Sequence, residues 1–383
     1  MGEVKQRDYV FDTLRGLCMW SIPISHFTRM AGHFSQDSLS GIMYITINVF
    51  VMQAFMFLSG YFSKKPDRSR EIAFKVFLWP YILSIFFFYG VRLLFWGSAN
   101  LYFDRAPFAM WFMLTLFLYK VFQKNYIKIP HFFAITFVLY LVAGCIPFLT
   151  DWMSLGRIVS YFPFFFLGYY CNADHIAKIK CLKKWQCGVL GVFLIGVSCF
   201  LAFCVPQVPV GWYLLKDPGS ATGVVWWLDI LMRLVLFVVG ALWIILMFNI
   251  LPGKDNYLAY VGRNTMPVYI LHLVVRQWMK QHGGISLGIF PMPEATSILY
   301  YVMTWGFASL CVVIFASKPV SKGYDWVIDT TYAIFMWVVN HILLPPFALL
   351  EKGLKAWGIG TIDFIQRQKN EVAGEDSEPA SAK

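Results

Sequence analysis

The chain has 383 residues, of which 58% are hydrophobic, 19% aromatic and 14% charged, and its mean hydropathy is +0.60. The charged fraction lies well below the soluble norm of about 25%, which excludes an ordinary soluble domain and predicts an integral membrane protein. The net charge of +11 does not indicate nucleic-acid binding, because Lys and Arg are divided among short segments between apolar runs.

Runs of about 17–25 apolar residues predict an all-α bundle with about ten membrane-spanning helices. They lie at 11–31, 41–63, 72–96, 106–122, 130–149, 157–172, 185–205, 224–250, 264–281 and 296–316. The apolar stretch 324–350 is compatible with an interfacial helix, a re-entrant segment or an eleventh span. We expect one membrane domain over 1–350, with its core at 8–316, and a disordered cytoplasmic tail over 366–383.

Charge in alternate segments predicts the orientation of this bundle. One side holds seventeen Lys and Arg residues, and the other holds four: Arg29, Arg105, Arg157 and Lys216. By the positive-inside rule, we expect a multi-pass protein of the cytoplasmic membrane with both termini in the cytoplasm.

The first predicted helix carries Asp12, Arg15 and His26 in an otherwise apolar run. Ionisable groups within hydrocarbon cost several kcal/mol, so they are usually functional. Arg15 and His26 are eleven positions apart, which places them roughly 16 Å apart along the axis and on nearly the same face. Arg15 either pairs with Asp12 or binds a phosphate or carboxylate. His26 either acts as a general base or is a structural group bonded to a neighbouring helix.

Further along the chain, a basic cluster follows the FLSGYF sequence that contains Ser59 and Gly60. Its members either bind anionic lipid headgroups or hold the phosphates of a nucleotide-bearing molecule, and they are Lys64, Lys65, Arg68 and Arg70. Trp111 is typical of an interfacial anchor. Asp229 and Arg233 have i,i+4 spacing and are expected to form a structural pair.

A second histidine, His272, lies within the ninth predicted helix and makes a polar cavity inside the bundle plausible. The eight cysteines show no metal-ligand spacing, and we expect no metal.

Taken together, these segments resemble the membrane-bound acyltransferase-3 family, particularly its fucose 4-O-acetylase-like branch. Asp12, Arg15 and Gly16 match its D-x-x-R-G motif, and His26 stands at the family's distance from the Arg. FLSGYF resembles the F-x-x-SG-[FY] motif, and Lys75 before Pro80-Tyr81 is similar to the basic residue that leads into the Pro-Tyr pair. The segments WFMLTLF from Trp111, RIVSYFPFFFLGYY from Arg157 and GRNTMPVYILH, ending at His272, also have counterparts in family order.

The resemblance implies transfer of an acyl group, usually acetyl from acetyl-CoA, to a hydroxyl of a carbohydrate or lipid-linked glycan of the cell envelope. It implies that Arg15 and His26 are the essential pair, with His26 acting as base or carrying the acyl group itself. The donor phosphates would meet Arg15, Lys64, Lys65, Arg68, Arg70 and Lys75. Supporting positions would be Asp12, Ser59, Trp111, Arg157 and His272.

Two other readings of the sequence are open. In a proton-coupled transporter or flippase, Arg15 and His26 would line a substrate path, although the two halves show no inverted repeat. A membrane scaffold or sensor is the third. Membrane lipids are expected partners in every case, and the sequence leaves homo-oligomerisation open.

Overall fold

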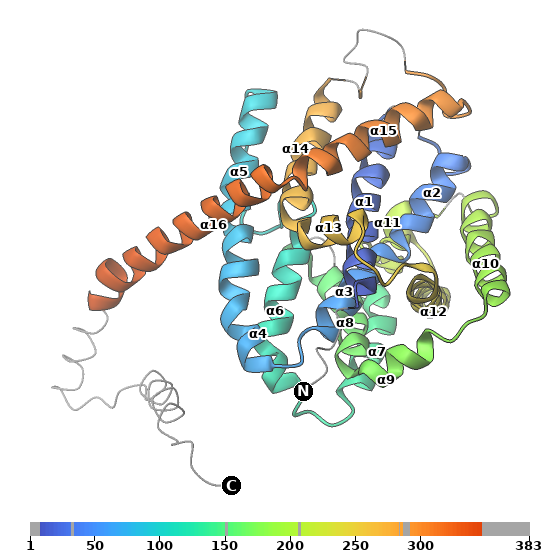
Figure 1. Cartoon of the computed structure of the whole chain (residues 1–383), viewed down its shortest axis with the longest axis horizontal. Helices are drawn as coiled ribbons and strands as arrows, with labels where there is room; N and C mark the ends of the chain where they lie inside the picture. Colours follow the sequence, from blue (N-terminus) through green and yellow to red (C-terminus); the bar gives the residue numbers. More distant parts are fainter. Residues whose placement is uncertain are drawn as a thin grey trace. The chain divides into compact units, whose positions relative to one another are not determined.

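The computed structural model describes residues 8–31, 34–149, 152–205, 208–282, 284–285 and 292–346 (Figure 1). The first half of the chain forms α1 (Val10–Met30), α2 (Leu39–Asn48), α3 (Val51–Tyr61), α4 (Pro66–Ala73), α5 (Trp79–Trp96), α6 (Trp111–Tyr126), α7 (Phe132–Val142) and α8 (Leu155–Tyr170). The second half forms α9 (Ala173–Ile179), α10 (Lys184–Phe203), α11 (Val210–Tyr213), α12 (Trp226–Ile250), α13 (Tyr257–Arg263), α14 (Thr265–Gln281), α15 (Ile298–Phe315) and α16 (Lys318–Val338). Short π-helical turns at Phe74–Leu78 and Val339–Leu343 extend α4 and α16.

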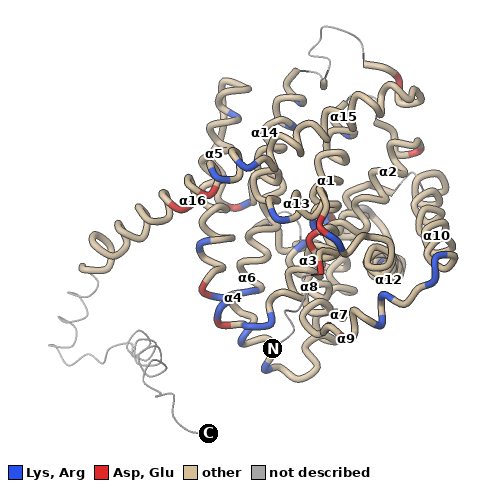
Figure 2. The backbone as a smooth tube through the Cα atoms, in the orientation of Figure 1, with Lys and Arg blue, Asp and Glu red and all other residues tan. Residues whose placement is uncertain are grey.

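Basic residues are concentrated in a few places along this chain. Figure 2 shows Lys and Arg gathered on α4 and the loop before it, and around α9 and the start of α10. These are the segments that the charge alternation assigns to the cytoplasmic side.

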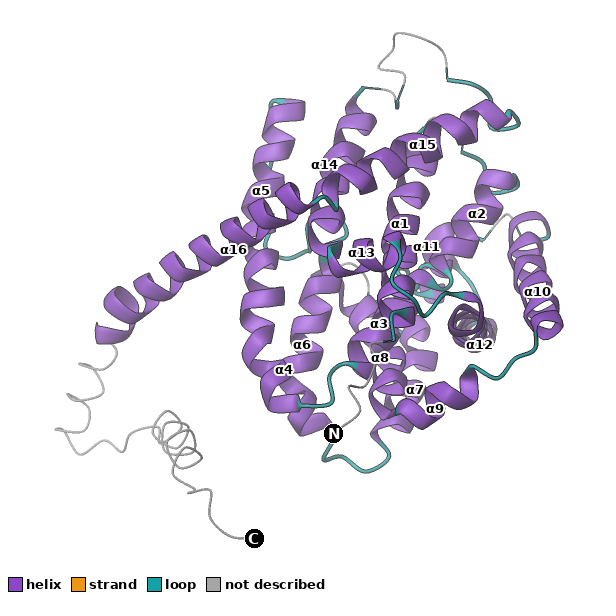
Figure 3. Cartoon of the chain, viewed as in Figure 1, coloured by secondary structure: helices purple, strands orange, loops and turns teal. Residues whose placement is uncertain are grey.

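The fold class predicted from the sequence is confirmed. Figure 3 shows only helices and loops over the described ranges, with no strand. Each of the ten predicted spans contains a helix, and among the described residues six helical segments are long and apolar enough to cross a membrane. By length and composition these candidates are Leu39–Tyr61, Pro66–Trp96, Lys184–Phe203, Trp226–Ile250, Ile298–Phe315 and Lys318–Pro346.

Contacts divide the chain into two compact units, Met1–Asp325 and Trp326–Lys383. Helix α16 runs across the boundary, so the stretch 324–350 is helical over its described part and its helix begins earlier than expected. The predicted tail 366–383 lies outside the described residues.

Helix α1 is the centre of the first unit, where it packs against α2, α3, α13, α14 and α15 (Figure 1). Its contact with α13 is backbone to backbone. A Cβ on Gly16 would lie 1.8 Å from the Leu258 carbonyl oxygen, and one on Gly262 would lie 1.9 Å from the Asp12 carbonyl oxygen. Small residues of this kind let helices approach closely inside a membrane, and here they fix the depth and rotation of Arg15.

A second pair of glycines joins α3 to α8 in the same way. A Cβ on Gly60 would lie 1.8 Å from the Phe165 carbonyl oxygen, and one on Gly168 would lie 1.9 Å from that of Phe57. The FLSGYF and FFFLGYY sequences are therefore the two halves of one helix crossing.

One sequence expectation is wrong in detail. The predicted single helix 41–63 is two helices, interrupted at Val49 and Phe50. Immediately before the break, the Asn48 amide donates to the Tyr44 carbonyl at 2.7 Å and to the Ser25 hydroxyl at 3.0 Å. Asn side chains compete in this way for backbone groups and weaken a helix locally.

The predicted Asp229–Arg233 pair is present and fully buried, with Nε and Oδ2 3.0 Å apart. The Trp212 indole donates to Asp229, and Arg233 donates to the Ser160 hydroxyl at 2.9 Å. The Tyr140 hydroxyl donates to the Arg233 carbonyl at 2.6 Å. The pair therefore joins α12 to α7, α8 and α11.

Candidate functional site

Two histidines from different helices meet inside the bundle. His26 of α1 and His272 of α14 approach to 3.3 Å between Nδ1 and Nε2, and His272 is completely buried. On its other side, His272 Nδ1 lies 2.8 Å from the Val268 carbonyl oxygen, one turn earlier in α14. The i,i+4 geometry of the helix thus orients the His272 ring, and the ring in turn contacts His26.

These contacts determine where the protons lie when both rings are neutral. The Val268 carbonyl can only accept, so His272 Nδ1 carries a hydrogen and its Nε2 is an acceptor. His26 must then donate through Nδ1, which leaves the lone pair of the neutral His26 ring on Nε2. A carbonyl that orients one imidazole, which orients a second, is an arrangement suited to a general base.

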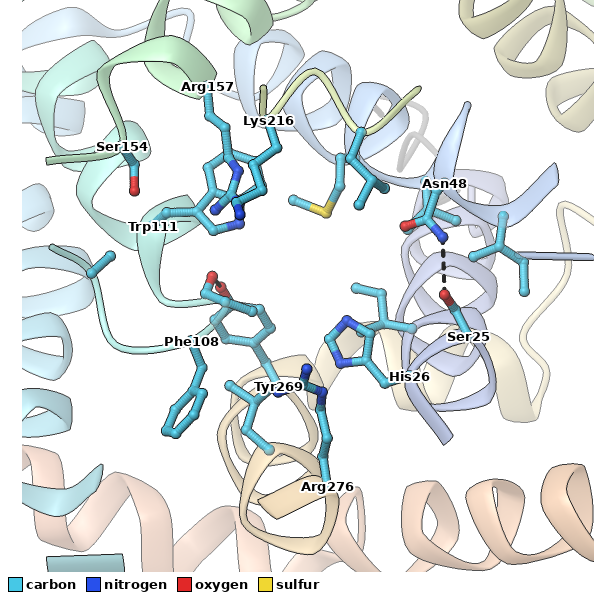
Figure 4. A pocket seen from close by; sticks show the side chains of 18 of the residues that line it. Ser25, His26, Asn48, Phe108, Trp111, Ser154, Arg157, Lys216, Tyr269 and Arg276 are labelled. Atoms are coloured by element: carbon cyan, nitrogen blue, oxygen red, sulfur yellow. Dashed lines mark hydrogen bonds between the residues drawn. The ribbon is translucent and has the colours of Figure 1, made fainter. Parts of the chain in front are cut away.

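A cavity of about 420 Å³ opens beside His26 (Figure 4). Its opposite wall contains Trp111, which stacks on Tyr161 with ring centroids 5.2 Å apart. The Arg157 guanidinium lies 5.0 Å from the Trp111 ring centroid. Trp111 is therefore a buried wall of this cavity, and Arg157 is held over its face.

Polar groups also line the α1 and α2 side of the same cavity. Ser25 and Asn48 are joined by the hydrogen bond at the helix break, and the Arg29 guanidinium donates to the Tyr44 hydroxyl at 3.1 Å. The interruption between α2 and α3 thus lies at the cavity edge. Interrupted helices at membrane depth commonly accompany binding sites, because irregular backbone is tolerated where it lines a cavity.

A second cavity of about 270 Å³ contains Arg15, as well as Ser59 from α3. Arg15 pairs with Asp12 at 3.8 Å, and its guanidinium lies 5.6 Å from the Phe62 ring centroid. About a third of the Arg15 side chain is exposed. The pairing that the sequence suggested is present, and it leaves the guanidinium at the edge of the cavity.

The two cavities adjoin one another along α1. Ile22, Met52 and Tyr269 line both of them, so these three side chains form the partition. A third cavity, at the start of α1, shares Arg15 and Phe62 with the second. The row of cavities follows the helix face that the eleven-residue spacing of Arg15 and His26 predicted.

Lys120 of α6, one of the seventeen basic residues on the more basic side of the bundle, is a member of the Arg15 cavity. It is 7% exposed, and its ammonium donates to the Ser63 hydroxyl. Phe112, Leu116 and Lys120 recur every four residues and all line this cavity. That periodicity was the signal that Lys120 faces inward with them.

In the basic cluster after α3, Lys64 bonds the end of another helix. The Lys64 ammonium bonds the carbonyls of Tyr169 and Cys171, where it closes the C-terminal end of α8. Burial lowers the pKa of Lys64, because the ammonium is partly removed from water. Lys64 is nevertheless exposed over much of its surface, as are the other basic residues here: Lys65, Arg68, Arg70 and Lys75. Donor binding by this cluster stays a prediction.

Comparison with known proteins adds one finding. The family model described as an acyltransferase domain, that of the acyltransferase-3 family, matches residues 8–317. No curated protein and no solved structure shows a significant match to the chain. The matched range includes the histidine pair and both cavities.

Proposed function

The chain belongs to the acyltransferase-3 family and is a membrane acyltransferase, and we propose that it moves an acetyl group from acetyl-CoA to a hydroxyl of a carbohydrate or lipid-linked glycan. Within the family we place it in the fucose 4-O-acetylase-like branch, on the motifs at Arg15, Ser59 and His272.

The observation that carries this proposal is the contact of His26 with His272 beside a cavity, since the tautomers inferred from it leave a lone pair on Nε2 of His26. In the proposed step, His26 Nε2 takes the proton of the acceptor hydroxyl while the hydroxyl oxygen attacks the thioester carbonyl. The new C–O bond forms and the C–S bond breaks. His26 then returns the proton to the departing thiolate, so the ring is restored for the next turnover.

His272 supports this step without touching the reacting atoms. When His26 is protonated, its Nδ1–H continues to donate to His272 Nε2, and the Val268 carbonyl holds His272 in the required tautomer. His272 is therefore a positioning residue in this proposal.

The Arg15 cavity supports the placement of the donor. Acyl-CoA is long and carries its phosphates at one end, and Arg15 with Lys120 supplies two cations in one cavity. The roughly 16 Å between Arg15 and His26 suits an extended molecule whose thioester reaches the second cavity. The partition of Ile22, Met52 and Tyr269 must yield to the pantetheine arm.

The direct test uses purified full-length protein in lipid nanodiscs, radiolabelled acetyl-CoA and the glycolipid fraction of the host membrane. We expect acetyl-CoA-dependent label in glycolipid hydroxyl esters, with release of free CoA thiol. If the label stays in acetyl-CoA while reconstituted vesicles accumulate a polar substrate, the enzyme assignment is overturned in favour of the transporter.

For Arg15→Lys, we expect about tenfold weaker acyl-CoA binding with a smaller change in kcat, because the charge is kept but the planar two-pronged donor is lost. Calorimetric titration with CoA, beside steady-state kinetics, measures both quantities. Arg263→Lys is the matched control, since Arg263 pairs with Asp255 at 3.0 Å and lines neither cavity. Equal CoA affinity in both variants would contradict a donor role for Arg15.

We also propose that the protein lies in the cytoplasmic membrane with both termini inside. Cys181 and Cys204 are exposed and stand just before and just after α10, so they probe the two sides. In variants that keep only one of them, a membrane-impermeant maleimide added to intact cells should modify Cys204 and not Cys181. The reverse result would invert the proposed orientation.

A further inference from the structure

Five cationic side chains surround the His26 cavity. They come from separate parts of the chain: Arg29 on α1, Arg105 before α6, Arg157 on α8, Lys216 after α11 and Arg276 on α14. No Asp or Glu is among the described residues that line this cavity. The site therefore concentrates positive charge beside the proposed base.

The positions of four of these cations in the sequence indicate that their meeting at one cavity is not a result of membrane topology. Arg29, Arg105, Arg157 and Lys216 are the four basic residues that the charge count assigns to the outer side. Such residues are disfavoured there, and all four line one cavity. Lys280 adds a further cation in a neighbouring cavity, which shares Phe108 with this one. Membrane topology does not account for this clustering, whereas a ligand of opposite charge does.

Two of these arginines lie over aromatic rings. Arg157 lies over the Trp111 ring and Arg29 over the Tyr44 ring, with centroid distances of 5.0 and 5.5 Å. Aromatic faces orient a guanidinium without neutralising its charge. Arg105 pairs with Asp104 at 3.2 Å and Lys216 with Asp217 at 3.8 Å, and neither of these carboxylates lines the cavity.

The geometry also separates two roles within the cavity. Figure 4 shows Arg157 and Lys216 reaching in over Trp111 on one side, with His26 and Arg276 on the other. A ligand can therefore present a hydroxyl to His26 while an oxyanion meets the arginines and the lysine. At about 420 Å³ the cavity is within the size range of small-molecule sites.

We infer that the acceptor carries an oxyanion, a phosphate or a carboxylate, which these five cations bind while its hydroxyl faces His26. The inference rests on the proposed acyl transfer and adds the chemical class of the acceptor. The phosphates of the donor are assigned to the Arg15 cavity, on the far side of the partition. The His26 cavity thus has a charge preference of its own.

The test measures binding of three probes to the full-length protein in phosphatidylcholine nanodiscs saturated with CoA. Inorganic pyrophosphate represents an acceptor that carries phosphate, and glucuronate represents one that carries a carboxylate. Glucose is the neutral control for glucuronate. We expect at least one anion to bind and glucose not to bind, and the tighter anion identifies the source. Arg157→Gln and Arg276→Gln should each weaken that binding about tenfold, as for loss of a charge-assisted hydrogen bond.

Two further variants distinguish an effect of lost charge on anion binding from an effect of misfolding. Arg157→Lys should keep most of the anion affinity, because the charge remains. Arg92→Gln removes a cation from α5 that lines a different cavity, so anion affinity should be unchanged. The inference is overturned if neither anion binds, or if Arg92→Gln weakens binding as much as Arg157→Gln.

The same nanodiscs, prepared without CoA and then titrated with it, distinguish this inference from the proposed function. If CoA competes with pyrophosphate and Arg157→Gln weakens CoA binding, the cations serve the donor, and the inference fails while acyl transfer stands. If CoA does not bind at all but the anion does, the donor proposal fails, and the cavity is an anion site of another activity.

Discussion

Replacing His26 with alanine is expected to lower acyl transfer by about 10²–10⁴-fold, which is the usual contribution of a general base, while CoA binding remains intact. The reason is geometric: Nε2 of His26 is the atom left unprotonated by the Val268–His272–His26 series of contacts, and His26 lines the cavity. Arg15, which is assigned to the donor phosphates, lies in the other cavity and is unchanged.

Initial rates of CoA release, with calorimetric CoA binding on the same sample, check this prediction. His282→Ala is the matched control, because His282 is exposed and its Nδ1 lies 3.0 Å from the Trp278 carbonyl, away from the cavity. Full activity in folded His26→Ala would remove the basis of the site. If His26 carries the acyl group covalently, radiolabelled acetyl-CoA should label the wild-type protein in the absence of acceptor. If His26 acts only as a base, the protein should stay unlabelled.

Replacing Arg233 with alanine is expected to cost about 3–5 kcal/mol of stability, the usual penalty for leaving one charge of a buried pair alone. Asp229 would stay buried without its cation, although the Trp212 indole would still donate to it, and Ser160 would lose its bond to Arg233. The measurement is the apparent Tm in detergent, followed by intrinsic fluorescence. A large drop is expected without any direct effect on the chemistry.

Two further variants test the origin of that loss. Lys124 pairs with Asp67 at 2.8 Å, but both side chains are mostly exposed, so Lys124→Ala should cost less than about 1 kcal/mol. The double variant Asp229→Leu, Arg233→Met should regain most of the stability, because no lone charge is left inside. A Tm for Arg233→Ala no lower than that for Lys124→Ala would show that the pair is unimportant.

Much of the fold could be predicted from the sequence, because long apolar runs and their polar interruptions carry strong signals. The relation of Arg15 to His26 follows from helix geometry alone, and the Asp229–Arg233 pair follows from i,i+4 spacing. The sequence did not predict helix α13, because a helix of seven residues is too short to show a helical repeat of apolar residues. The break after Asn48 was missed because Asn48 also bonds Ser25 on another helix, a contact that the sequence of 41–63 does not show.

The composition of the His26 cavity could not be predicted in the same way. Arg105 and Lys216 lie on connecting segments, and Arg29, Arg157 and Arg276 lie on three different helices. Nothing local in the sequence joins five residues so far apart, because their meeting depends on how the helices pack. The sequence did place four of them, Arg29, Arg105, Arg157 and Lys216, on the side of the bundle with few basic residues, which was the usable part of the signal.

The two glycine crossings also determine how the passage between the cavities can move. Because α1 meets α13, and α3 meets α8, with no room for a single added carbon, neither pair can slide or rotate against its partner. The partition must therefore open through its own side chains, and Met52, with its unbranched chain, is the most adaptable of the three. Rotamer changes are much faster than collective helix motions, which take microseconds to milliseconds. Passage of the pantetheine arm would then be governed by local side-chain kinetics, and stiffening the surrounding bilayer should leave the rate of donor entry unchanged.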